Sequence, residues 1–126
     1  MSAPLDFYTY EETLAAQATN PKPLARTLSE FEFQYITTNQ ELAQAIAPIL
    51  GCTLLAIDTE TTGLDPHRDK LRLVQVATRK HPCLVIDLWR VSDLTPLKTL
   101  LAGSARKVAH TLLFDWKWLQ ANELPL

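Results

Sequence analysis

The chain has 126 residues, of which 47% are hydrophobic and 21% charged, and its formal net charge is -2. This is the composition of one ordinary globular domain, and the chain is too short for two independent cores. The slight negative charge excludes nucleic-acid binding through a strongly positive overall field, so any such contact has to be local. No apolar run approaches about 18 residues, so no membrane span is predicted. The N-terminus lacks the basic-then-apolar order of a secretory signal, and a cytoplasmic location is expected.

Residues 1–30 are predicted to form an N-terminal arm or linker, because Pro21 and Pro23 stand there among polar residues. The domain itself is expected over residues 31–126. It opens with a predicted strand at 31–38, which is rich in aromatic and β-branched residues.

A helix is then predicted to begin at a capping residue, Thr38 or Asn39, with Glu41 in its first turn. Its apolar residues recur at helical spacing until Gly51. Pro48 is expected to distort the last turn.

Three strands are predicted next, at residues 52–58, 71–78 and 82–88. The connections between them are too short for crossover helices, so an antiparallel meander is expected. Within this region the two cysteines, Cys52 and Cys83, form no CxxC pair, which argues against zinc and for small apolar side chains in a reducing compartment.

A helix capped by Ser92 or Asp93 is predicted to run to Gly103, followed by a short strand at 106–110 and a last helix over 111–120. Three antiparallel strands, a helix, a strand and a helix are the opening order of the α/β ribonuclease H-like fold. That fold expects a further strand and helix, whereas this sequence ends at Leu126. The prediction is therefore the front half of the fold, with its C-terminal part missing.

The most informative motif is LLAIDTETTGL, in which Asp58 and Glu60 follow a buried strand. Residues two apart on a strand project from the same face. Two adjacent carboxylates repel each other unless a cation lies between them, and such hard oxygen ligands suit magnesium or manganese. Gly63, just beyond, permits a tight turn and a close backbone approach.

Other chemistries also place an acid after a buried strand. Haloacid-type phosphatases use DxDxT, whereas the second acid here is Glu60; actin-like ATPases need a glycine at that position. Only three glycines are present and none clusters, which excludes Rossmann and P-loop sites. Asp115, near the start of the last helix, decides between these chemistries. If the strand before it lies beside the strand of Asp58, Asp115 can face the same metal, whereas phosphatases and ATPases need no acid at that position. Asp87, in contrast, is expected only to enter a loop or to cap the next helix.

The segments LLAIDTETTGLDPHRDKLRLVQVAT and KVAHTLLFDWKWL resemble the first and second motifs of the DEDD superfamily of 3′–5′ exonucleases. The proofreading domain of DNA polymerase I and ribonuclease D are the most similar branches. The resemblance covers roughly residues 33–119. It implies hydrolysis of the terminal phosphodiester with two magnesium or manganese ions about 3.5–4 Å apart. Asp58 would bridge both ions, Glu60 would bind the ion on the nucleophile side, and Asp115 the ion on the leaving-group side.

The resemblance also implies substrate contacts. Thr61, Thr62, Gly63 and Leu64 match the stretch that receives the 3′-terminal nucleotide of single-stranded DNA or RNA, with Leu64 packed on the base. His110 and Thr111 belong to the second motif and are assigned to the substrate side. Thr111 is a departure, because family members usually carry Asn there, and the fourth aspartate of the third motif has no counterpart.

From these departures the chain alone is expected to be a poor exonuclease or none. An uncovered sheet edge and an apolar helix face predict self-association or a complementing C-terminal segment. The alternative function is a non-catalytic remnant that serves as a nucleic-acid-binding or assembly module.

Several conspicuous side chains are given ordinary roles. Trp116 is expected in the core and Trp118 is ambiguous. His67 and His81 lie in polar loops and are expected to be solvated. The basic residues after the DxE loop are as consistent with a solvated face as with phosphate contacts; they are Arg68, Lys70 and Arg72.

Overall fold

The computed structural model describes residues 32–126, so the predictions made for residues 1–30 lie outside the described part. Its strands and helices follow one another in the predicted order. They are β1 (Phe33–Ile36), α2 (Asn39–Ile46), the 3₁₀ helix η2 (Ala47–Ile49), β2 (Leu54–Thr61), β3 (Leu71–Ala77), β4 (Cys83–Asp87), α3 (Thr95–Ala102), β5 (Arg106–Val108) and α4 (Leu112–Ala121).

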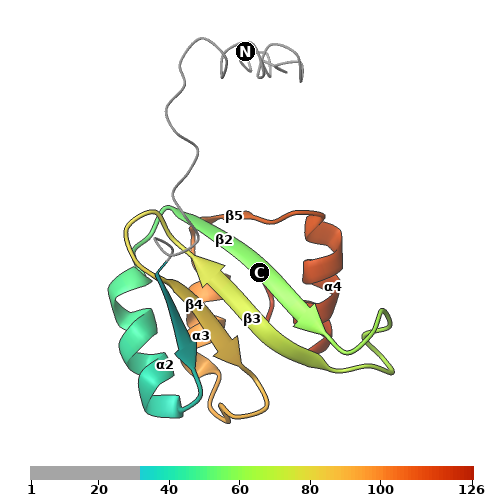
Figure 1. Ribbon diagram of the computed structural model, residues 1–126. Coiled ribbons are helices and arrows are strands. Elements are labelled where there is room, and N and C mark those ends of the chain that lie inside the picture. Colours follow the sequence, from blue (N-terminus) through green and yellow to red (C-terminus); the bar gives the residue numbers. More distant parts are fainter. Residues whose placement is uncertain (1–31) are drawn as a thin grey trace, which may run out of the picture. The chain divides into compact units, whose positions relative to one another are not determined.

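The strands form one five-stranded sheet in the order β1-β4-β3-β2-β5 (Figure 1). β3 is antiparallel to both β2 and β4, which confirms the predicted meander. β5 returns parallel to β2, and β1 adds to the far edge parallel to β4. The strand with the two acids therefore lies inside the sheet, between β3 and β5.

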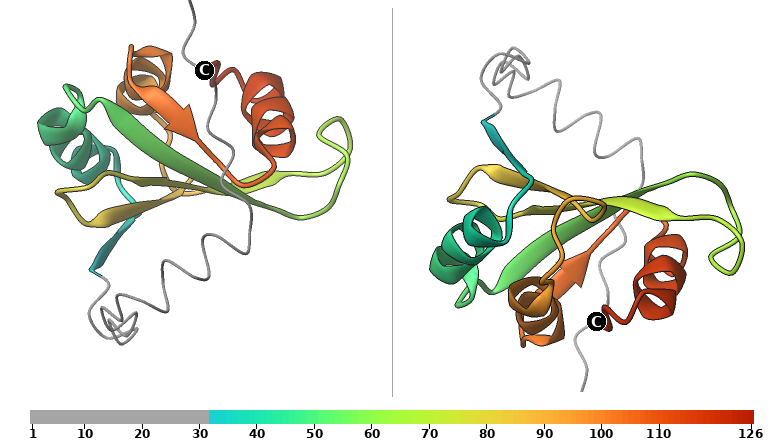
Figure 2. Two further views of the ribbon diagram at one scale, coloured as in Figure 1. Left: turned by 90° about the horizontal axis from the view of Figure 1, so that it is seen from above. Right: turned by 90° about the horizontal axis from the view of Figure 1, so that it is seen from below.

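The helices α2, α3 and α4 all lie on one side of the sheet (Figure 2). The strand residues on that side are buried, among them Ile36, Val74 and Ile86, each 0% exposed. They pack with Leu97 and Leu119 of the helices in a single core. The other face of the sheet has no helix over it within residues 32–126. The acids of β2 project from this open face.

The first helix begins as the sequence indicates. The Thr38 side chain accepts a hydrogen bond from the Glu41 amide, and the Glu41 carboxylate accepts one from the Thr38 amide, which completes a capping box. Pro48 ends the α-helical bonding, because it lacks an amide proton, and the chain continues as the 3₁₀ turn η2. The predicted helix to Gly51 is thus a shorter α-helix followed by this turn.

The start of α3 lies later than predicted. Neither Ser92 nor Asp93 is its N-cap, which is Leu94 and has no side-chain cap bond. The Asn39 side-chain oxygen accepts hydrogen bonds from the Ser92 and Asp93 amides, so these residues are held in the preceding loop. Asp93 still accepts a bond from the Thr95 amide. The hydrogen bonds to Asn39, which is distant in the sequence, thus explain why α3 begins only at Thr95.

The tryptophans of α4 correct a prediction made from helical spacing. Trp118 is the core residue, at 1% exposed, whereas Trp116 is 44% exposed. Trp118 packs beside Phe114, with ring centroids 6.2 Å apart. Nearly every face of this helix carries a large apolar residue, so spacing alone did not indicate which face the sheet covers. Leu113 is also exposed, and the predicted self-association or complementing segment stays a prediction.

Asp87, expected only to enter a loop or cap a helix, is fully buried at the end of β4. Its carboxylate accepts hydrogen bonds from the Tyr35 hydroxyl at 2.5 Å, the Arg72 guanidinium at 2.9 Å and the Trp89 amide at 3.0 Å. The Arg72 guanidinium also stacks 4.1 Å from the centre of the Trp89 ring. Arg72 is therefore part of a structural cluster and not of a solvated face.

No helix within residues 32–126 has both the length and the apolar character needed to cross a bilayer.

Candidate active site

Two acids lie side by side on the open face of the sheet. Asp58 of β2 pairs with Gln75 of β3, and Glu60 pairs with Leu73. Both acids project from the face of the sheet that is opposite to the core. Both are exposed. Neither carboxylate has a hydrogen-bond or ion-pair partner among residues 32–126. Their mutual repulsion is therefore not relieved within this part of the chain, which is the condition that favours a bound cation.

The negative charge of Asp58 affects the thiol of Cys83 on β4. The pKa of the Cys83 thiol is raised, first by burial and then by the negative charge of Asp58. Cys83 therefore stays a neutral thiol near neutral pH. Cys52 and Cys83 are both free and half-buried.

Hydrogen bonds join the two ends of the loop that follows β2. The Thr62 amide donates to the Lys70 carbonyl, and the Lys70 amide donates to the Thr62 hydroxyl, both at 2.9 Å. The Asp69 carboxylate accepts a hydrogen bond from the Asp65 amide and fills the space that a side chain on Gly63 would need. Gly63 thus allows a close approach, as predicted, though of a side chain and not of another backbone.

The predicted substrate-binding residues flank this closed loop. The Thr61 hydroxyl donates to the Gly63 carbonyl at 2.7 Å. Leu64 is 85% exposed, so it projects from an ordered loop with its apolar side chain in water. The contact of Leu64 with a nucleotide base stays a prediction.

Asp115 lies on the opposite side of β2 from the other two acids. It is 2% exposed, in the first turn of α4. Its carboxylate accepts a hydrogen bond of 2.6 Å from the hydroxyl of Thr59. Thr59 stands between Asp58 and Glu60 in the sequence and points to the covered face, paired with Val74. Within residues 32–126, no three Asp, Glu, His or Cys side chains are close enough to hold a metal ion together.

Thr59 is the residue that the sequence analysis missed. A polar residue on the core face of a strand needs a buried hydrogen-bond partner. That signal is present in the pattern, because Thr59 alternates with the two acids and follows the apolar Leu55 and Ile57. The partner, Asp115, is 56 residues away in the chain.

His110 and Thr111 lie in the turn between β5 and α4, and both are exposed. Thr111 has φ 57° and ψ 54°, the left-handed conformation. This conformation costs an L-residue about 1–2 kcal/mol, and a β-branched residue is seldom found there, whereas Asn adopts it more readily. Thr111, which stands where family members usually carry Asn, is therefore more strained in this conformation than Asn would be.

Thr111→Asn is expected to stabilise the domain by about 1 kcal/mol, through relief of this strain. For a domain of this size, thermal unfolding should shift upward by about 4–8 °C. Thr99→Asn is the matched control, because Thr99 is an exposed residue of α3, and its melting temperature should barely change. A Thr111→Asn variant that melts at or below the wild-type temperature would contradict the strain.

The donor set fits hard divalent cations in part. Asp58 and Glu60 supply two free carboxylates on one face, the ligand type that Mg²⁺ and Mn²⁺ prefer. Asp115 could serve as the third ligand only by giving up its bond to Thr59.

Comparison with known proteins decides the family. The model of the 3′–5′ exonuclease domain matches residues 33–124, which include both motifs. The chain belongs to the 3′–5′ exonuclease family. The resemblance stated from the two motifs is thereby confirmed, and the exonuclease family is one that normally uses divalent metal ions.

Three relatives illustrate the similarity. DNA polymerase I of Aquifex aeolicus (strain VF5) is 38% identical over 88 residues, which are 70% of this chain and 14% of the polymerase. The structure of Escherichia coli RNase D, an exoribonuclease involved in structured RNA processing, matches with a TM-score of 0.63 at 28% identity, over 70% of this chain and 24% of RNase D. Brucella melitensis NrnC bound to pGG matches with a TM-score of 0.56 at 28% identity, over 75% and 46% of the two chains.

These neighbours establish the ribonuclease H-like fold of the exonuclease domain. The exonuclease chain spans about a seventh of the polymerase and about a quarter of RNase D.

Proposed function

We propose that this domain removes nucleotides from the 3′ end of single-stranded DNA or RNA, using Asp58, Glu60 and Asp115 as ligands of two magnesium or manganese ions. The observation that carries the proposal is the pair of exposed, unpartnered carboxylates on the open face of β2, within the matched exonuclease region. When bound, such ions activate a water and stabilise the charge on the departing 3′ oxygen.

The three acids take different roles in this proposal. As the family resemblance implies, Asp58 would contact both ions. Glu60 would hold the ion on the nucleophile side. Asp115 would hold the ion on the leaving-group side after giving up its bond to the Thr59 hydroxyl, which requires its carboxylate to leave the covered side of β2. Thr59 thus keeps the buried Asp115 carboxylate satisfied until a cation is present.

The loop after β2 receives the terminal nucleotide. Leu64, 85% exposed, offers the apolar surface for the base. The bonds between Thr62 and Lys70 hold the loop in place, which lowers the entropic cost of binding. Two similar structures support a nucleic acid as the ligand: Escherichia coli RNase D, an exoribonuclease involved in structured RNA processing, and Brucella melitensis NrnC bound to pGG. His110 and Thr111 are proposed to contact the bound nucleic-acid strand as well.

Manganese binding tests the proposal without any need for turnover. Manganese at about 100 times its dissociation constant is expected to stabilise the chain by about 2.7 kcal/mol, a shift in melting temperature of roughly 10 °C or more. The paired variant Asp58→Asn/Glu60→Gln should show almost no shift, because both exposed ligands are lost. In EDTA it should melt within a few degrees of wild type, since exposed substitutions change stability little.

Glu123→Gln is the control, because Glu123 is an exposed acid outside the DxE motif. It should retain the full manganese shift. If the paired variant were stabilised as much as wild type, Asp58 and Glu60 would not be metal ligands and the proposed site would be wrong.

A further inference from the structure

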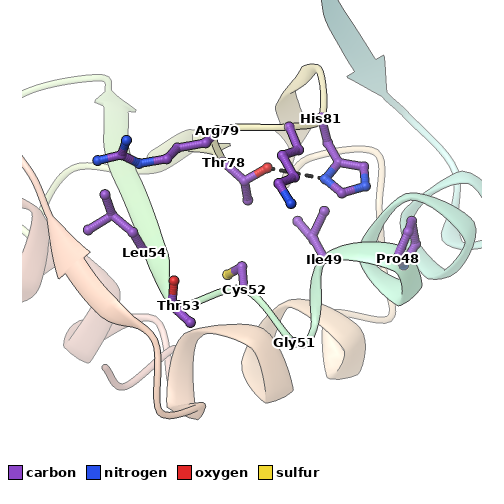
Figure 3. Close-up of a pocket in the computed structure, with 10 residues that line it drawn as sticks. Pro48, Ile49, Gly51, Cys52, Thr53, Leu54, Thr78, Arg79 and His81 are labelled. Carbon is purple, nitrogen blue, oxygen red and sulfur yellow. Dashed lines mark hydrogen bonds between the residues drawn. The ribbon is translucent and has the colours of Figure 1, made fainter.

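Two cavities of the described domain lie away from Asp58 and Glu60, at the other end of β2. One, of about 400 Å³, is lined by Pro48 and Ile49 of η2, by the start of β2 and by the turn between β3 and β4, which includes Arg79, Lys80 and His81 (Figure 3). A second, of about 550 Å³, is lined by Ser104 and Arg106 as well. Thr53, Leu54 and Arg79 line both cavities, which therefore adjoin at the start of β2; together they are called the depression below.

This depression is basic and contains no acid. Neither set of lining residues includes Asp or Glu. Among residues 32–126 the one ion pair joins Arg72 and Asp87, so Arg79, Lys80 and Arg106 have no ion-pair partner there, and all three are exposed. In a domain with little net charge, a local group of unpaired cations is the feature that phosphate recognition needs.

The side chains present hydrogen-bond donors together with this charge. The Arg79 guanidinium extends over Leu54, while His81 turns toward the Thr78 hydroxyl, 3.3 Å from its Nδ1 (Figure 3). Arginine offers several donors in a fixed plane, which matches the oxygens of a phosphate.

The part of the depression that Leu54 and Arg106 line shares one face of the sheet with the acids. Leu54, Ala56, Asp58 and Glu60 alternate along β2 on the open face. Arg106 pairs with Leu54 in the parallel ladder, so it stands on the same face at the same level. Ala56, exposed and small, lies midway and leaves the surface low. At about 3.3 Å per residue, Leu54 is roughly 13 Å from Asp58 and 20 Å from Glu60 along the strand.

We infer that Arg79 and Arg106 bind backbone phosphates of a single-stranded nucleic acid several nucleotides upstream of its 3′ end, with Lys80 adding charge. The strand would run along β2, over Ala56, from the basic depression to the acids. The direction of the strand rests on the proposed function, which places the 3′ end at Asp58 and Glu60. Binding to the depression itself does not.

Direct binding in EDTA tests this inference. Fluorescence anisotropy of labelled dT12 and rU12 with the full chain is expected to show that Arg79→Ala/Arg106→Ala weakens binding about tenfold near 0.1 M salt. The slope of log K against log salt should fall by about 1.4, because about 0.7 is lost for each phosphate contact to a single strand.

The matched control is Arg90→Ala/Lys98→Ala, which removes the same charge from two exposed residues outside the depression. Its affinity and salt slope should remain near wild type. Equal weakening in both variants would show a general charge effect and overturn the inference. Undetectable binding of both 12-mers by wild type, or unchanged binding by Arg79→Ala/Arg106→Ala, would overturn it as well.

Two further arms identify the ligand. A labelled dinucleotide is too short to reach from the acids to the depression, so its affinity in manganese should be the same for wild type and for Arg79→Ala/Arg106→Ala. Inorganic phosphate at the same phosphate concentration should not displace dT12; if it does, the depression is a site for small anions and the inference is wrong.

These readouts separate the inference from the proposed function. Loss of manganese stabilisation in Asp58→Asn/Glu60→Gln reports on the acids alone, and metal-free binding of dT12 reports on the basic residues alone. Either result can fail while the other holds.

Discussion

Asp58→Asn is expected to lower the rate of metal-dependent nucleotide release from a single-stranded 3′ end by about a thousandfold or more. Asp58 is the proposed ligand of both ions, and the ions supply several kcal/mol of charge stabilisation, with each 1.4 kcal/mol worth about tenfold in rate. The substitution keeps the size of the side chain and removes only the charge. The measurement is the shortening of a 5′-labelled oligonucleotide in magnesium or manganese, with EDTA as the blank.

The wild-type rate itself is expected to be low, because the third acid is held by Thr59 on the other side of β2. Slow release is still measurable, since uncatalysed phosphodiester hydrolysis is negligible by comparison. Glu123→Gln should cleave at the wild-type rate. Equal cleavage by Asp58→Asn would exclude Asp58 from the chemistry. A wild-type chain that binds manganese and DNA but releases nothing would favour the non-catalytic binding module.

Asp87→Ala should produce the largest loss of stability of any single substitution considered for this domain, about 3 kcal/mol, the lower end of the range for removing one partner of a buried ion pair. The substitution leaves the Tyr35 hydroxyl, the Trp89 amide and the Arg72 guanidinium without their shared acceptor. Arg72 is 35% exposed, so water can replace part of what it loses. Against a typical total of about 5–15 kcal/mol, such a loss is large.

Chemical denaturation at pH 7 measures this effect, and two variants calibrate it. Tyr35→Phe removes one donor and should cost about 1.5 kcal/mol, the usual value for a hydrogen bond to a charged group. Glu123→Ala, on the surface, should change the free energy of unfolding by less than about 0.5 kcal/mol. If Asp87→Ala were as mild as Glu123→Ala, the cluster would not support the end of β4.

The same carboxylate should make the domain sensitive to acid. Burial opposes the charged form of Asp87, but the hydrogen bonds from Tyr35 and Trp89 and the charge of Arg72 outweigh it, so its pKa lies below the ordinary value. A lowered pKa gives stability that is present above the unfolded pKa, about 3.9, and is lost as the pH falls through the folded pKa. Wild type should therefore lose more stability below about pH 4 than Asp87→Ala does.

The sequence by itself determined the order of the elements and the motif residues. Alternation over Leu54–Thr61 placed Asp58 and Glu60 on one face, because the side-chain period of a strand is fixed by its backbone. The short connections around Leu71–Ala77 required an antiparallel meander. Thr38 and Glu41 defined the start of α2, since both partners of a capping box lie within one turn. Each of these inferences rests on interactions between residues close together in the chain.

Tertiary structure alone decided where the side chains of distant segments meet. The partner of Thr59 is Asp115, the partner of Asp87 is Arg72, and the buried tryptophan of α4 is Trp118. In each case several partners had the right chemistry. The packing of α4 on one face of the sheet selected Asp115 and Trp118, and the pairing of β3 with β4 selected Arg72. The depression shared by Arg79 and Arg106 is of the same kind, because neighbours in a sheet need not be neighbours in the chain.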